Sequence, residues 1–88
     1  PVRMDSLQAA ALMQKLGMKI DLIYIDAAHD FKSVYKDIEA WYPLVSKDGV
    51  FCGDDWNYGD EVARAATVFA EKNGIKVCHE GGFWWFEN

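Results

Sequence analysis

The sequence predicts an α/β fold built around one mostly parallel β-sheet. Segments with the 3.6-residue apolar period of amphipathic helices alternate with short β-branched runs, in the order α-β-α-β-α-β-β. Only a few residues, including a glycine pair, separate the last two runs, so these two strands should pair antiparallel. Strand–helix–strand units have right-handed crossovers and place helices over a parallel sheet. We therefore expect parallel strands, an antiparallel last strand and helices on both faces of the sheet.

The first three elements are marked by cap and stop residues. The apolar spacing predicts a helix over residues 6–16 that ends at Gly17. The β-branched run 20–25 (Ile-Asp-Leu-Ile-Tyr-Ile) favours a buried strand, typical of a parallel sheet. Asp30 is placed to cap a long helix, which should end before Pro43.

The second half of the chain repeats the same alternation. A strand is predicted over residues 49–53, followed by a helix over 60–72 whose first residue is an aspartate able to cap it. An Asn-Gly pair closes this helix, and strands over 75–79 and 83–86 follow. The last strand contains two consecutive tryptophans, which must point to opposite faces of the sheet.

Composition limits the class of protein. The chain has 88 residues, a hydrophobic content of 51% and an aromatic content of 15%, which excludes a disordered chain and fits one domain or part of one. Nine basic and fourteen acidic residues give a net charge of −5, which argues against a nucleic-acid partner. No membrane-spanning run and no signal peptide are recognised, so we expect a cytoplasmic protein with no membrane association. Cys52 and Cys78 lie in apolar runs, as expected of buried, reduced thiols.

Three carboxylates should meet at one edge of the sheet. Asp26 follows the first strand, and Asp54 and Asp55 follow the second. Ligands bind at the carboxyl ends of strands in such sheets, and clustered carboxylates suit a hard cation such as Mg²⁺. The alternative is that these aspartates only cap a helix, close a turn or face solvent. Likewise, His29 is either a general base or a residue flanking a helix, and Trp56 is either a wall of a substrate site or a packing residue.

Two motifs carry a resemblance to a known family. The segments Asp26 to His29 and Gly53 to Asp55, set in the runs 21–41 and 43–55, resemble the class I S-adenosylmethionine (SAM)-dependent methyltransferases. Within that class they are similar to the small-molecule O-methyltransferase group with D-x-x-H and G-D-D motifs. The resemblance implies that the chain is the C-terminal half of a Rossmann-like methyltransferase domain. Its strands would be the fourth to seventh of the family, in the spatial order 4-5-7-6, with the last one antiparallel.

The resemblance also implies roles for individual residues. The cation, Mg²⁺ or another divalent ion, would bind the oxygens of a small-molecule acceptor, and a base would take the acceptor's proton. The implied residues are catalytic His29 and Asp26; metal ligands Asp26, Asp54 and Asp55; cofactor contacts Asp5, Ser6, Asp26, Ala27 and Ala28; and substrate contact Trp56. Ala27 and Ala28 stand where many relatives have Gly and Asp.

The sequence has no G-x-G-x-x-G motif, so the glycine-rich loop that cradles the cofactor is missing. Residues 1–88 are therefore expected to form a single partial domain that is inactive on its own. One hypothesis is a fragment or truncated form of a SAM-dependent, Mg-assisted O-methyltransferase that associates with an N-terminal half. The other is a non-catalytic half-domain that forms a homodimer through the exposed edge of strand 20–25.

Overall fold

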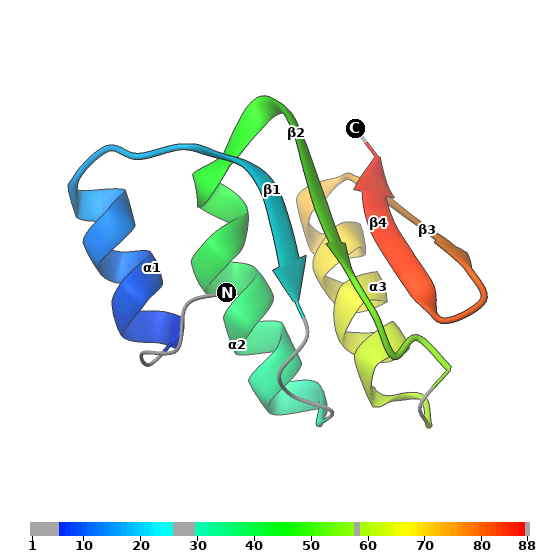
Figure 1. Ribbon diagram of the computed structural model, residues 1–88. Helices are drawn as coiled ribbons and strands as arrows, with labels where there is room; N and C mark the ends of the chain where they lie inside the picture. Colours follow the sequence, from blue (N-terminus) through cyan, green and yellow to red (C-terminus); the bar gives the residue numbers. More distant parts are fainter. Residues whose placement is uncertain (1–5, 26–29, 58, 88) are drawn as a thin grey trace.

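The protein is described here by a computed structural model, which covers residues 6–25, 30–57 and 59–87 (Figure 1). The order of helices and strands is the predicted one. Within the described ranges, no helix is both long and apolar enough to cross a membrane. The elements are α1 (Ser6–Lys15), β1 (Ile20–Ile25), α2 (Phe31–Trp41), the short 3₁₀ helix η1 (Tyr42–Leu44), β2 (Val45–Gly53), α3 (Glu61–Asn73), β3 (Lys76–Glu80) and β4 (Phe83–Glu87).

The strands form one mixed sheet in the order β1-β2-β4-β3. β1 and β2 are parallel, whereas β4 pairs antiparallel with both of its neighbours, so the last strand is inserted between the second and third. This confirms the order 4-5-7-6 and the antiparallel last strand. β2 begins at Val45 rather than at the predicted residue 49, because Val45 already pairs with Ile20 of β1. The register between the two strands then shifts before Leu22 pairs with Val50.

The helices that the structure describes lie on one side of the sheet (Figure 1). Side chains of all three helices form the main core with Ile23, Phe51 and Trp84, whereas the alternate strand positions are exposed. The sequence-based expectation of helices on both faces therefore differs from the structure of the described residues. The reason is topological: both crossovers, β1 to β2 and β2 to β3, are expected to be right-handed and step in the same direction, which places α2 and α3 on the same face.

The opposite side of the sheet is apolar and has no described element over it; we call it the open face. Leu22 is 62% exposed there, and the indole of Trp85 lies on this side while that of Trp84 is fully buried on the other. The two consecutive tryptophans thus have different environments, and only one of them packs under helices. The side chains that define the open face are Leu22, Tyr24, Val50, Cys78, Phe83 and Trp85.

Local chemistry explains where the two long helices begin and end. The Asp30 carboxylate accepts a hydrogen bond from the Ser33 amide (3.0 Å), which confirms the predicted cap of α2 and lowers the pKa of Asp30. Asp60 makes no side-chain cap bond to α3, contrary to the prediction. Gly74 ends α3 in the left-handed conformation (φ 65°), as the Asn-Gly pair predicted.

Candidate functional site

The carboxyl ends of β1 and β2 lie side by side, as the prediction of a shared site required. Ile25 is in register with Gly53, and the Asp54 amide donates to the Ile25 carbonyl at 3.4 Å. Residues that leave these two strands therefore start from one edge of the sheet. Of the predicted site residues, Asp5 and the segment 26–29 lie outside the described residues, and Ser6 is described only as the first residue of α1.

The Asp54–Asp55 pair forms a tight acidic turn at this edge. The Asp54 Oδ1 atom accepts a hydrogen bond from the Asp55 amide (2.9 Å), and Asp55 has a left-handed backbone (φ 64°), which aspartate tolerates better than most residues. Both residues are half-buried. One carboxylate oxygen thus holds the turn.

Within its described residues, the structure does not bring the predicted metal ligands together as a set. Among the residues that the structure describes, no group of three or more His, Cys, Asp or Glu side chains is arranged to hold a metal ion. Mg²⁺ in proteins is commonly bound by one or two carboxylates, with water and substrate oxygens completing its six ligands. Two of the predicted ligands, Asp54 and Asp55, belong to this turn, and the third, Asp26, is outside the described part, so the metal site stays a prediction.

Trp84 holds the acidic turn in place through a hydrogen bond and through packing against Gly53. This role was not predicted from the sequence. The indole Nε1 donates to the Asp54 carbonyl (3.1 Å), and its ring lies so close to Gly53 that a Cβ at that position would overlap it. The glycine of the G-D-D motif is therefore required by the packing of a tryptophan 31 positions later in the chain. One feature of the sequence could have indicated this contact: a glycine ends one strand, and a tryptophan lies on the strand expected to pair beside it.

Trp56 is anchored to the β3–β4 hairpin. Its ring stacks on His79 with centroids 4.6 Å apart and planes 14° apart, and its amide donates to the Gly82 carbonyl (3.0 Å). The side chain is half-buried against the core. Of the two roles considered for Trp56, packing is therefore visible in the structure, and a contact with substrate stays a prediction.

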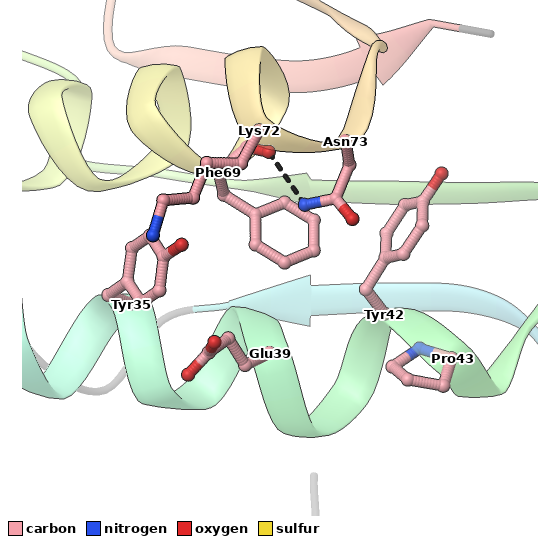
Figure 2. Close-up of a pocket in the computed structure, with 7 residues that line it drawn as sticks. All are labelled: Tyr35, Glu39, Tyr42, Pro43, Phe69, Lys72 and Asn73. Atoms are coloured by element: carbon pink, nitrogen blue, oxygen red, sulfur yellow. Dashed lines mark hydrogen bonds between the residues drawn. The ribbon is translucent and has the colours of Figure 1, made fainter.

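A shallow pocket of about 380 Å³ lies away from the acidic turn, between α2 and α3 (Figure 2). Phe69 and Tyr35 supply aromatic surface, the Lys72 ammonium lies 5.8 Å from the Tyr35 ring centroid, and the Asn73 amide donates to the Phe69 carbonyl (2.8 Å). None of the predicted site residues lines it. Its lining residues are Tyr35, Glu39, Tyr42, Pro43, Phe69, Lys72 and Asn73.

Comparison with known proteins gives one match. A family model described as a methyltransferase domain matches residues 1–56, which include both motifs and end at Trp56. Neither a curated protein nor a solved structure matches the chain significantly.

Proposed function

The chain belongs to the methyltransferase-domain family, and from this premise we propose that it is the acceptor-binding C-terminal part of a SAM-dependent O-methyltransferase that acts on a small molecule with the help of Mg²⁺. SAM is the usual cofactor of methyltransferases. The finer parts of the proposal, namely the metal, the oxygen acceptor and the small substrate, rest on the two motifs and on the geometry of the acidic turn.

The observation that carries the proposal is the position of the acidic turn. Asp54 and Asp55 follow a strand in parallel register with β1, at the carboxyl edge where α/β sheets bind their ligands. In the proposal these carboxylates, together with Asp26, hold a cation that lowers the pKa of an acceptor hydroxyl. His29 accepts the hydroxyl proton, and Trp56 borders the acceptor. When bound, SAM supplies the methyl group.

The proposal requires a glycine-rich loop from outside these 88 residues. In the described part of the chain, no strand pairs with the outer edge of β1, so a further parallel strand can add there. A loop that follows such a strand would emerge at the same edge of the sheet as the acidic turn, because the carboxyl ends of parallel strands share an edge. We therefore include an N-terminal strand–helix unit as the expected partner of the catalytic form.

Calorimetric titration of the purified chain with Mg²⁺ and, separately, with SAM tests the proposal. We expect measurable Mg²⁺ binding that weakens at least about tenfold in Asp54→Asn, because the amide keeps the oxygen that holds the turn but loses the charge. Asp48→Asn, at an exposed position of β2, is the matched control. Equal Mg²⁺ affinity in both variants would contradict the metal role, and micromolar SAM binding would contradict the need for a second unit.

A second candidate function is a non-catalytic half-domain that self-associates. The observation in its favour is the edge of β1, which carries no Lys or Pro of the kind that usually protects an exposed strand. Its one charged side chain, Asp21, accepts a hydrogen bond from Ser46 Oγ (2.7 Å). Edge-to-edge pairing of two Ile20–Ile25 strands would give a twofold dimer, and hydrogen exchange of the β1 amides distinguishes it from a free edge.

A further inference from the structure

Two segments that carry predicted site residues start from neighbouring strands. Residues 26–30 join β1 to α2, and residues 54–60 join β2 to α3; we call them the site segments. Where they leave the sheet, Ile25 is in register with Gly53, and the Ile25 carbonyl accepts a hydrogen bond from the Asp54 amide. The starts of the site segments are therefore held together by the strands, and the two helices that follow begin at the same end of the sheet (Figure 1).

Glu61, the first residue of α3, links that helix to the start of α2. Its Oε1 atom accepts a hydrogen bond from the Phe31 amide (3.1 Å), and its Oε2 atom accepts one from Arg64 Nη2 (2.9 Å). The Arg64 guanidinium in turn lies 4.8 Å from the centroid of the Phe31 ring. Phe31 is the first residue of α2, so its amide is one of the donors that a helix leaves without a partner of its own. The far ends of the site segments are therefore tied together as well.

The ion pair between Glu61 and Arg64 orients the carboxylate more than it stabilises the fold. The side chains of Arg64 and Glu61 are 54% and 42% exposed, and ion pairs between exposed side chains contribute little to stability. Arg64 binds one carboxylate oxygen while the Phe31 amide binds the other, so the carboxylate is held in one orientation. With both ends tied, each site segment has fewer conformations open to it.

We propose that Glu61 is a positioning residue, which keeps the two site segments at a fixed separation at the carboxyl edge of the sheet. The strand register at one end and the Glu61–Phe31 bond at the other close a circuit, which we call the frame. One site segment carries the acidic turn, and the other carries Asp26 and His29 in its sequence. A cation that takes ligands from both segments binds more tightly when they are already in place, because less conformational entropy is lost. This role in cation binding rests on the proposed function, whereas the frame itself is a property of the fold.

A carboxylate that only caps α2 would act differently, and Asp30 provides the comparison. Asp30 caps the same helix by accepting a hydrogen bond from the Ser33 amide (3.0 Å), but both residues lie on one side of the frame. Removal of either carboxylate costs α2 one hydrogen bond at its start and costs the chain one negative charge. Only the removal of Glu61 opens the frame, so Asp30→Ala is the matched control for Glu61→Ala.

Amide exchange rates, measured by NMR in the absence of metal, test the frame. Glu61→Ala should speed exchange of the Phe31 amide about tenfold and of the Asp55 amide about threefold, because the Asp55 amide is bonded within the turn that the frame holds. Glu61→Gln keeps an oxygen that can accept the Phe31 amide, so both rates should stay within about twofold of the parent. Asp30→Ala should speed exchange at Ser33 and leave Asp55 unchanged. The frame is overturned if Asp55 does not respond to Glu61→Ala, or responds as strongly to Asp30→Ala.

Calorimetric titration of the same variants with Mg²⁺ tests what the frame does for the site. Glu61→Ala should raise the Kd for Mg²⁺ about fivefold, whereas Glu61→Gln and Asp30→Ala should stay within about twofold of the parent. Equal losses in Glu61→Ala and Glu61→Gln would assign the effect to charge and overturn the positioning role, as would an equal loss in Asp30→Ala. A parent chain that binds no Mg²⁺ contradicts the proposed function, and the exchange rates then decide the frame alone. Circular dichroism of every variant excludes loss of folding as the cause.

Discussion

Gly53 shows how a single motif residue can serve packing and chemistry together. In the sequence it belongs to the G-D-D motif and directly precedes the two carboxylates. In the structure it is the position at which the Trp84 ring meets the backbone, and the same indole holds the Asp54 carbonyl. The lack of a side chain at residue 53 thus allows a buried tryptophan to support the acidic turn.

Gly53→Ala should destabilise the protein by about 1–3 kcal/mol, because the added methyl group overlaps the buried Trp84 ring. Urea unfolding followed by tryptophan fluorescence measures the loss. Gly82→Ala is the matched control, since the nearest atom to its Cβ, Asp54 Oδ1, is at an acceptable 3.4 Å. Similar losses in the two variants would contradict the close packing of Trp84 on residue 53.

The starts of α2 and α3 involve hydrogen bonds over very different sequence separations. α2 begins at a side-chain cap that the sequence reveals, because the capping residue and its partner are three positions apart. α3 begins differently: Glu61 in its first turn accepts a hydrogen bond from the Phe31 amide (3.1 Å), which ties the starts of α3 and α2 together. This contact joins residues 30 positions apart and leaves no local pattern in the sequence. Asp60 does occupy the N-cap position of α3, and its carbonyl accepts a hydrogen bond from the Arg64 amide (2.9 Å), but its side chain makes no cap bond, so only the predicted side-chain cap is wrong.

Asp30→Ala should lower the melting temperature more than Asp60→Ala, because only Asp30 makes a side-chain cap bond. The effect depends on pH. Hydrogen bonding to Ser33 lowers the pKa of Asp30 below its ordinary value of 3.8, so the ionised cap stabilises the fold above that pH and the contribution is lost as the pH falls through the lowered pKa.

Thermal melts of both variants and of the parent from pH 7 to pH 2 measure this dependence. The difference between Asp30→Ala and the parent should be largest at neutral pH and should shrink below pH 3.8. A difference that stays constant with pH, or a larger effect of Asp60→Ala, would show that the Asp30 carboxylate does not act as the cap.

At the scale of the whole molecule, the sheet is covered on one face within the described part of the chain, and its two edge strands, β1 and β3, are each paired on one side only. β2 is paired on both sides, with β1 and with β4, whereas β1 is paired only with β2. Parallel sheets are normally buried on both faces. In the proposed catalytic form, the uncovered face and the outer edge of β1 are the surfaces against which a further strand–helix unit would pack.

Hydrogen exchange of backbone amides tests the free edge. In a parallel pair, every second amide of β1 points away from β2, so these amides should exchange about a hundredfold faster than those of β2. The measurement is made by NMR in dilute and in concentrated protein. If two Ile20–Ile25 strands paired edge to edge, all β1 amides would become protected at high concentration, whereas a chain that does not pair through this edge would leave the outward amides exchanging fast at both concentrations.

Much of the fold was predictable because its causes are local. Glycine, proline and capping residues mark the ends of helices within a few positions, and the period of apolar residues identifies each element, so the order of elements was correct. The candidate site was predictable only in part. The pairing of Ile25 with Gly53 confirms that two motif strands share an edge, but the stacking of Trp56 on His79 joins residues 23 positions apart and had no signal in the sequence.

The sequence by itself determined the α/β class, the order of the elements and the antiparallel pairing of the last two strands, because turn chemistry and apolar periodicity are properties of short segments. The insertion of the last strand between its neighbours was implied only by the family resemblance that the two motifs carry. Only the tertiary structure decided that the described helices share one side of the sheet, that Trp84 rather than Trp85 is buried, and that Trp56 stacks on His79. These features depend on which strands become neighbours and in which direction each crossover steps. Those are properties of the assembled sheet, and contacts between residues far apart in the chain establish them.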